Sequence, residues 1–596
     1  MGGNSVALGN SMERPLLVLV LLKTVLSQDF VSVHLPQLGA IRGSTSTSLW
    51  SRTTIYQFQG IPYAKPPSND LRFKEPVPPD PWEGELDATH FKRQCPQIIS
   101  EQDMADIKSR MEFEDLEDCL HLNVYTVQIP GKCTKKMPVM FYIHGGSFRQ
   151  GSAKDFRPNY LLEEDVVLVV IQYRLGPLGF LSLQNDDISG NMGLLDQLLA
   201  LEWVNKHISS FCGDPDQVTI FGQSSGAAAV SLMIVSPLAN EKLFNKAIIQ
   251  SGSSFCQWAV DYNPVENAKN ISRLANCSTE VDSELYACLK NLNVYEILIA
   301  HSNFLSNVLD KYEEVITVSG GNHAVIQTAG KKRFLTEDPR KSYALKKYMK
   351  IPTMIGVTKD EGSFIVGNVY DFLLDGNITG KEEMLRDMLV ESAVKFSGIK
   401  DPSGLITDIF TKQFFKEEDL GNFMAMVPGL VDLCGSALLK SCVLKQARQN
   451  FKDGNTYLYT FNYRGHLTKF GYGVEVNFPF SGGVAHSDDL IYLFPHKDGN
   501  LTQSEMQIAK TVVELWTNFA KNGKPVPATN VNNWPPMVNQ DGPYLIIDKV
   551  PHIGTSFVDQ YTVTIREGLD TDAAAIKHTS LAILFAIVII QAIELF

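Results

Sequence analysis

Residues 217–235 read QVTIFGQSSGAAAVSLMIV. The apolar run at the start of this stretch is typical of a buried strand, and the run after the pentapeptide GQSSG can open a helix. Ser224 would then lie on a sharp turn from strand to helix, which closes only when its neighbours are small. Gly222 and Gly226 supply that space. The stretch therefore predicts a strand–turn–helix unit of an α/β protein, with a hydroxyl lifted out of the sheet.

The pentapeptide alone is weak support for a nucleophile, because G-x-S-x-G arises by chance in roughly one chain in five of this length. Its setting gives it weight. The turn aims the hydroxyl at a helix N-terminus, where backbone N–H groups favour a developing negative charge. An ordinary βα turn is the alternative. We predict that Ser224 is a catalytic nucleophile.

Strands and helices alternate around this unit. The segments 137–143 and 165–174 are continuous apolar runs, as expected of strands covered on both faces. Helices are expected at 192–211 and 504–521, where apolar residues recur at helical spacing. Further buried strands are expected at 217–221, 246–250, 352–357 and 455–461. This alternation predicts the α/β class, with a mostly parallel central sheet and helices on both faces.

A serine hydroxyl needs a base that removes its proton during attack. The stretch GVAHSDDLIYLF (483–494) places His486 on a loop bounded by glycine, and GVTKDEGSF (356–364) offers acids after a buried strand. His486 would take the Ser224 proton and return it to the leaving alcohol, while an acid holds the imidazole in the right tautomer. The residues alone leave four candidates for that acid: Asp360, Glu361, Asp488 and Asp489.

The tetrahedral intermediate of such a reaction carries an oxyanion that needs fixed donors. The stretch HGGSF (144–148) directly follows an expected strand, and tandem glycines let two amides converge without obstruction by Cβ atoms. We assign the backbone amides of Gly145, Gly146 and Ser225 to the oxyanion hole. A plain glycine turn is the alternative.

These stretches and several others resemble the carboxylesterase/cholinesterase family of α/β-hydrolases, from about Phe58 to Val563. The supporting motifs include FQGIPYA (58–64), EDCLHLNVYT (117–126), GNMGLLDQLLALEWV (190–204) and QSGS (250–253). The resemblance implies an α/β-hydrolase fold and ester hydrolysis through an acyl-enzyme. It selects Glu361 as the acid of the triad and leaves Asp488 and Asp489 as neighbours of His486.

The resemblance also implies two disulfides, Cys95–Cys119 and Cys277–Cys288. Nine cysteines are an odd number, so at least one thiol is free or pairs between chains. The remaining cysteines are interpreted mostly as small buried hydrophobes: Cys133, Cys212, Cys256, Cys434 and Cys442.

Departures from the family pattern narrow the range of expected substrates. Cholinesterases hold a quaternary ammonium on a tryptophan between the first two cysteines, and the segment 96–118 has none here, which argues against choline esters. Trp258 and Phe364 match family positions that line the gorge, so both are predicted to contact substrate. With glutamine at position 223, directly before the serine, the chain resembles insect juvenile-hormone esterases and related insect carboxylesterases.

Both ends of the chain carry apolar segments. Residues 15–26 (PLLVLVLLKTVL) precede a plausible cleavage site and predict a signal peptide, with a buried helix or an uncleaved anchor as the alternatives. Residues 581–593 (LAILFAIVIIQAI) follow small residues and a polar spacer, an order that resembles a GPI-attachment signal; a short membrane helix is the alternative. The predicted organisation is a signal peptide at 1–27, one domain at 28–567, and a linker with a removable tail at 568–596.

Secretion is also indicated by N-x-[ST] glycosylation sequons and by the cysteine content. The sequons are at Asn270, Asn276, Asn377 and Asn500. We therefore expect an extracellular protein, GPI-anchored to the cell surface or otherwise secreted.

The composition is that of a globular protein, with a net charge of −13 that makes nucleic acid an unfavourable partner. The expected partner is a small-molecule ester, with no cofactor and no metal, and the oligomeric state is left open. Two other functions fit the same resemblance. One is a surface recognition protein without catalysis, and the other is a scavenger that is acylated but turns over slowly.

Overall fold

The computed structural model describes residues 30–98, 100–309, 320–375, 382–396, 400–420, 422–471, 478–496 and 499–569. The predicted signal peptide and the GPI-like tail lie outside these described residues, as does the sequon at Asn377.

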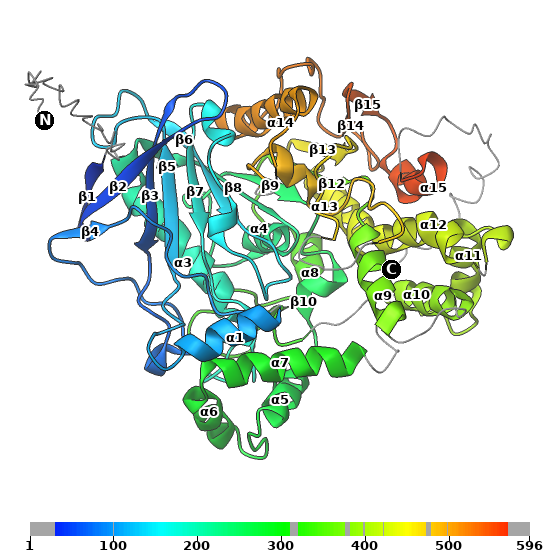
Figure 1. Ribbon diagram of the computed structural model, residues 1–596, viewed down its shortest axis with the longest axis horizontal. Helices are drawn as coiled ribbons and strands as arrows, with labels where there is room; N and C mark the ends of the chain where they lie inside the picture. Colours follow the sequence, from blue (N-terminus) through cyan, green and yellow to red (C-terminus); the bar gives the residue numbers. More distant parts are fainter. Residues whose placement is uncertain are drawn as a thin grey trace, which may run out of the picture.

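A sheet of 13 strands runs through the molecule in the order β1-β2-β3-β5-β7-β6-β8-β9-β12-β13-β14-β15, with β4 beside β2 (Figure 1). The central strands pair in parallel: β7 (Val167–Ile171), β6 (Met137–Ile143), β8 (Gly213–Gln223), β9 (Lys246–Gln250), β12 (Thr353–Thr358), β13 (Thr456–Phe461) and β14 (Tyr544–Ile547). The outer strands pair antiparallel: β1 (Val31–Leu35), β2 (Gly39–Thr47), β3 (Thr54–Pro62) and β5 (His121–Thr126) at one edge, β15 (His552–Gly554) at the other. Strand β4 (Glu85–Asp87) pairs parallel to β2. The predicted mostly parallel sheet is confirmed.

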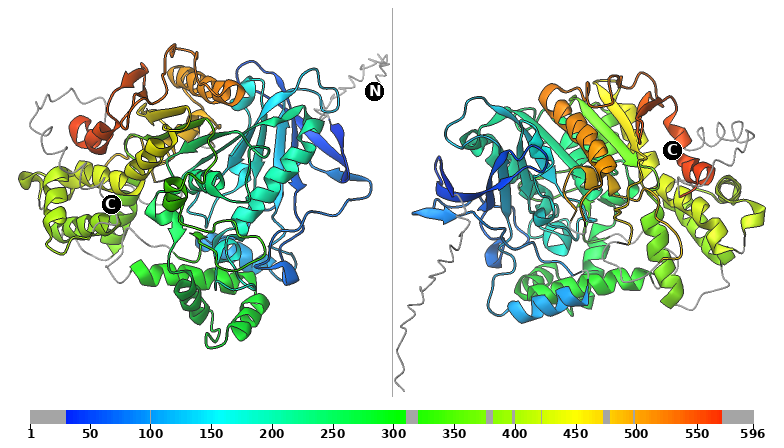
Figure 2. Two further views of the ribbon diagram at one scale, coloured as in Figure 1. Left: turned by 180° about the vertical axis from the view of Figure 1, so that it is seen from behind. Right: turned by 45° about the horizontal axis from the view of Figure 1, so that its top comes forward.

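Helices cover both faces of the sheet, and this explains the continuous apolar runs. Val139, Phe141 and Ile143 of β6 belong to a core shared with α3 (Met192–His207), α4 (Ser225–Val235) and α13 (Ser441–Asn450). Met140 and Tyr142, which point to the other face, belong to a core shared with α14 (Gln503–Asn522). Figure 2 shows α14 in orange over its face of the sheet. Every residue of β6 is therefore buried except Pro138, which is half-buried.

The two helices predicted by periodicity are present with small changes at their ends. Helix α14 begins with a capping box between Thr502 and Glu505, and ends at Gly523, which adopts a left-handed conformation. Helix α3 ends at His207, and the chain continues to Phe211 as a tighter 3₁₀ turn.

Two groups of helices lie outside the layered body and were not predicted. The first group, here called the helical lobe, has its own core and consists of α9 (Ser363–Asp375), α10 (Glu382–Phe396), α11 (Leu405–Phe414) and α12 (Phe423–Gly435). The second packs below the sheet in Figure 1 and consists of α1 (Glu101–Arg110), α5 (Pro264–Leu274), α6 (Asp282–Asn291) and α7 (Val294–Leu309). The remaining short elements are α2 (Gly176–Phe180), α8 (Pro339–Ala344), α15 (Val563–Glu567), β10 (Val260–Asp261) and β11 (Ala324–Val325).

One helical run, residues 423–450, is long and apolar enough to cross a membrane. Within its apolar window 83% is buried inside the fold, which identifies it as a core element.

Four disulfides cross-link the described residues. Two are those implied by the family resemblance, Cys95–Cys119 and Cys277–Cys288. The other two join Cys133 to Cys212 and Cys256 to Cys442, so the interpretation of these four as isolated buried hydrophobes is wrong. Their partners are 79 and 186 positions apart, and only the folded sheet brings them together. Cys434 is the buried free thiol, and burial raises its pKa to about 12, which makes it unreactive.

Candidate active site

Ser224 follows β8 at the turn into α4, as the sequence predicts. Its backbone has φ 58° and ψ −126°, a conformation that a non-glycine residue adopts only under constraint. The constraint is visible in one contact, because the N–H of Ser224 donates to the carbonyl of Gln250 at the end of β9 (2.8 Å). The serine is partly accessible to solvent. The turn therefore presents its hydroxyl at the carboxyl edge of the parallel strands.

The two glycines that flank the serine are required by close packing. A Cβ on Gly226 would lie 2.1 Å from the carbonyl oxygen of Ile143, and a Cβ on Gly222 would lie 2.6 Å from the backbone of Gly226. Strand β6 thus passes too close to the turn for any side chain, which supports the reason given for the spacing of GQSSG.

Glu361 and His486, two of the predicted triad residues, are in direct contact. The Nδ1 atom of His486 lies 2.6 Å from Glu361 Oε2, and Thr358 N–H donates to Glu361 Oε1 (2.8 Å). Complete burial pushes the pKa of Glu361 upward, but the charge of His486 and these hydrogen bonds outweigh it and hold the pKa below its usual value. An ionised Glu361 keeps the imidazole proton on Nδ1 and leaves Nε2 as the acceptor.

The other three candidate acids have structural partners. Asp360 accepts from the N–H of Val484 (2.8 Å) and the hydroxyl of Thr564 (2.7 Å), which fixes the loop before His486. Asp488 accepts from the N–H of Ala485 on the same loop (2.9 Å).

Asp489 accepts from the Gln250 side chain (2.7 Å), whose own backbone carbonyl holds Ser224. Burial raises the pKa of Asp488 to about 7 and that of Asp489 to about 6. Gln250 thereby links an acid beside His486 to Ser224, a connection that the sequence analysis missed.

The glycine loop predicted to bind the oxyanion follows β6 and lies against Ser224. A Cβ on Gly145 would lie 3.0 Å from the Cβ of Ser224, and Gly146 has φ +110°, which suits glycine. Ser225 Oγ accepts from the N–H of Phe148 (3.1 Å) and so joins the loop to the start of α4. The amides of Gly145, Gly146 and Ser225 therefore belong to two neighbouring segments at one sheet edge.

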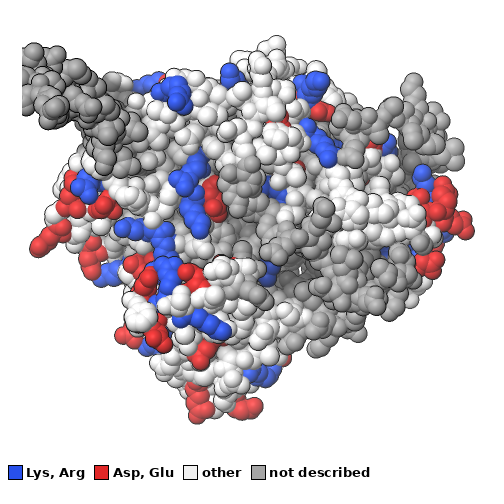
Figure 3. Space-filling model, viewed as in Figure 1, with Lys and Arg blue, Asp and Glu red and all other residues white. Residues whose placement is uncertain are grey.

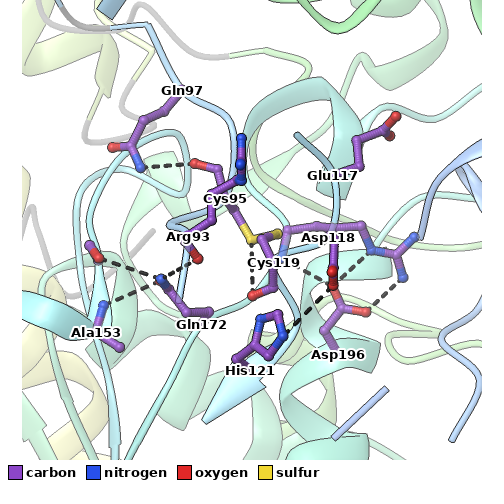
Figure 4. The surroundings of a disulfide bond; sticks show 12 residues. Arg93, Cys95, Gln97, Glu117, Asp118, Cys119, His121, Ala153, Gln172 and Asp196 are labelled. Atoms are coloured by element: carbon purple, nitrogen blue, oxygen red, sulfur yellow. Dashed lines mark hydrogen bonds and ion pairs between the residues drawn. A yellow bond between two sulfur atoms is a disulfide. The ribbon is translucent and has the colours of Figure 1, made fainter. Parts of the chain in front are cut away.

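The far end of this loop is clamped by a segment that the Cys95–Cys119 disulfide anchors (Figure 4). Gln97 Nε2 donates to the carbonyl of Gly151 (3.0 Å), and Gly151 N–H donates to Gln97 Oε1 (2.8 Å). Gln172 ties the same region from the sheet, since it binds both the carbonyl of Arg93 and the N–H of Ala153. No sequence signal identified Gln97, because its partner is a backbone group far along the chain.

The predicted substrate-contacting aromatics lie close to these groups in different ways. Phe364 stacks on the imidazole of His486 with ring centroids 4.8 Å apart. Trp258 is partly buried, donates to the carbonyl of Leu438 (3.0 Å), and packs against the same helical-lobe core as Phe364. Gln223 Nε2 donates to His486 Nε2 (3.1 Å), so the unusual glutamine touches the nitrogen that would accept the serine proton.

Among the described sequons, Asn276 and Asn500 are exposed and Asn270 is half-buried. These positions are compatible with the predicted glycosylation, which stays a prediction.

The mostly parallel sheet, its two helical layers and a strand–turn–helix carrying Ser224 define an α/β-hydrolase fold. The sequence profile of the Carboxylesterase family matches residues 28–563, and the chain belongs to this family. It is 34% identical to juvenile hormone esterase of Tribolium castaneum over 518 residues, covering 83% of this chain and 84% of that one. It is 32% identical to liver carboxylesterase of Sus scrofa, covering 82% of this chain and 84% of that one. It is also 32% identical to Esterase E4 of Myzus persicae, with 79% and 83% covered.

Proposed function

We propose that this carboxylesterase-family protein hydrolyses carboxylic esters with Ser224 as nucleophile, His486 as general base and Glu361 as the acid that orients it. Attack of Ser224 Oγ on the ester carbonyl transfers its proton to His486 Nε2, and the imidazolium is stabilised by Glu361. The amides of Gly145, Gly146 and Ser225 donate to the oxyanion. His486 then protonates the leaving alcohol, and water, activated by the same base, releases the acid.

The proposal is carried by the 2.6 Å contact between His486 and Glu361 at the sheet edge where Ser224 begins α4. A recognition protein without catalysis has no need of a buried carboxylate held on an accessible imidazole. The mechanism also requires a movement of Gln223. Its side-chain amide occupies the Nε2 atom of His486 and has to leave that atom before Ser224 can transfer its proton there. We propose that Phe364 and Trp258 line the substrate site. Both are partly exposed: Phe364 stacks on the imidazole of His486, and Trp258 packs against the same helical-lobe core as Phe364.

The test compares the secreted protein with Ser224→Ala on 4-nitrophenyl butyrate, and adds labelling by a fluorophosphonate. The expected result is turnover and labelling by the wild type, both lost in the variant. Ser109→Ala, an exposed serine on α1, serves as the matched control and keeps both. Equal turnover by Ser224→Ala would remove Ser224 from the mechanism. Labelling without turnover would support the scavenger hypothesis, because acylation would then outpace release of the enzyme.

Four disulfides indicate folding in an oxidising compartment. We propose that residues 1–27 direct secretion of a single domain at 28–567, and that the tail at 568–596 is exchanged for a GPI lipid. Phosphatidylinositol-specific phospholipase C should release the esterase from cells that express the full chain. Retention on treated cells, while a known GPI protein is released, would favour a membrane helix.

A further inference from the structure

Arg149 lies on the glycine loop, three residues after Gly146, and its backbone is held tightly. Its N–H donates to the carbonyl of Gly146 (3.0 Å), and Gln97 clamps the loop at Gly151. On the other side, Asn322 Nδ2 donates to the carbonyl of Ser147 (2.8 Å). The guanidinium is therefore carried by the same rigid segment that offers Gly145 and Gly146 to the substrate.

The side chain of Arg149 is open to solvent, yet protein surrounds it closely enough that burial lowers its pKa. The side chain is therefore accessible to a ligand while neighbouring protein atoms reduce its contact with water. Arg333, which is also exposed, lies beside the exposed Lys331 and Lys332 and away from the glycine loop in the sequence. Figure 3 shows charged side chains along the left, upper, lower and right margins of the drawn face, and Lys and Arg also lie left of its centre.

No hydrogen bond or ion pair to the guanidinium of Arg149 is present among the described residues. The two arginines buried in the described core are both paired, Arg72 with Glu117 and Arg174 with Asp196 (2.6 Å). Desolvating a cation without a partner costs free energy, which a bound anion would recover. Arg149 is thus an unpaired charge on the loop that follows β6, and this loop lies against Ser224 at Gly145.

Two buried histidines among the described residues, His301 and His323, are within electrostatic reach of Arg149, and neither neutralises it. Burial, with a contribution from Arg149, lowers the pKa of His301 to about 4 and that of His323 to about 3, so both are uncharged near neutral pH. His323 packs edge-on against Phe148, the residue before Arg149 (ring centroids 6.2 Å apart). Of these three side chains, only Arg149 carries a charge near neutral pH.

We propose that Arg149 forms an anion subsite of the active site, which binds a carboxylate carried by the ester substrate away from the scissile bond. A guanidinium binds a carboxylate through two parallel N–H···O hydrogen bonds, which fixes the substrate in orientation as well as in charge. The same cation repels a quaternary ammonium group, in agreement with the missing tryptophan. The preferred substrates are therefore anionic esters, and the inference rests on the ester hydrolysis proposed above.

The test uses two pairs of esters that differ only in charge. On the acyl side, mono-4-nitrophenyl adipate is compared with 4-nitrophenyl 6-methylheptanoate, in which an isopropyl group replaces the carboxylate. On the alcohol side, 4-acetoxybenzoate is compared with 4-isopropylphenyl acetate. The quantity is the ratio of kcat/KM between wild type and Arg149→Met for each ester, because intrinsic reactivity cancels in that ratio.

Arg149→Met should lower kcat/KM about tenfold for the anionic member of at least one pair, mainly through KM, and change both neutral esters less than twofold. The arm that responds tells whether the acyl or the alcohol portion carries the anion. Arg149→Lys should restore part of the loss, and Arg333→Met, which removes an equal charge from the surface, should change no ester.

An equal fall for both members of each pair would mean that Arg149 only supports the glycine loop, and no change in any ester would mean that it is an idle charge. Either result overturns the subsite. Failure of the underlying function is seen separately, as wild-type protein that hydrolyses none of the four esters or as Ser224→Ala that hydrolyses them equally well. Thermal unfolding of Arg149→Met, expected to match wild type, shows that the loop is intact.

Discussion

Replacing Glu361 by glutamine changes two atoms and, according to the structure, reverses the tautomer of His486. The backbone N–H of Thr358 donates to Glu361 Oε1 at 2.8 Å and still requires an oxygen in the variant. The amide oxygen of glutamine therefore occupies that position, and its NH₂ group faces His486 Nδ1, which in the wild type lies 2.6 Å from a carboxylate oxygen. A donor facing Nδ1 drives the imidazole proton to Nε2.

The expected loss follows from that switch. An imidazole protonated at Nε2 cannot accept the proton of Ser224, and the amide no longer stabilises an imidazolium. The corresponding change in a Ser-His-Asp enzyme lowers kcat about 10⁴-fold. We therefore expect Glu361→Gln to lower kcat about 10³- to 10⁴-fold, with KM changed less than about threefold, because substrate contacts are untouched.

The assay is steady-state hydrolysis of 4-nitrophenyl butyrate, with thermal unfolding of each variant as the check on folding. Asp360→Asn is the matched control, since Asp360 is the adjacent and equally buried acid but faces Val484 and Thr564. It should cost less than about tenfold in kcat. If Glu361→Gln keeps more than a tenth of the wild-type kcat, or if Asp360→Asn loses as much as Glu361→Gln, the assignment of the acid is wrong.

Three further outcomes are expected. Removing the Cys133–Cys212 disulfide by a double serine substitution frees a link between positions 79 apart and should lower the free energy of unfolding by about 2–4 kcal/mol in urea titrations; an unchanged midpoint would contradict this. Burial raises the folded pKa of Asp488 to about 7, so the stability that its protonated form contributes below about pH 4 is lost as pH rises to 7. Asp488→Asn should therefore flatten the fall in Tm between about pH 4 and 7, and an unaltered slope refutes the shift. Gly145→Ala, whose methyl would press on Ser224 Cβ at 3.0 Å, should lower kcat at least about a hundredfold, and near-normal kcat would remove this glycine from the oxyanion hole.

The central fold could be predicted because its strands are buried on both sides. The run 137–143 is apolar at every position that meets α3, α4 or α14, and β6 has the predicted bounds. The antiparallel edge was not predicted, because a strand such as β2 (GAIRGSTST) mixes small and polar residues without a continuous apolar run. The helical lobe was missed for another reason. Its core is assembled from helices spread between residues 363 and 435, and no single stretch of sequence indicates that these helices pack together.

The positions of Ser224 and of the glycine loop could be predicted, because in both cases the residues that suggest chemistry also determine the local backbone turn. The choice between Asp360 and Glu361 was beyond the residue pattern, because adjacent side chains leave one turn in opposite directions. Thr358 N–H binds one of them and Val484 N–H the other, and only the folded backbone decides which faces His486. Long-range disulfides and the Gln97 clamp were unpredictable on the same ground, since each partner is set by the tertiary fold.

The parallel sheet gathers its reactive groups from segments that are remote in the chain, after β6, β8, β12 and β13. No fragment that folds early can contain all of them, and the slow closure of such distant pairings comes last. Esterase turnover is therefore a late reporter of assembly. During refolding, helical signal should recover before any product is formed, and a single nick between β8 and β12 should silence the enzyme while most of its secondary structure persists.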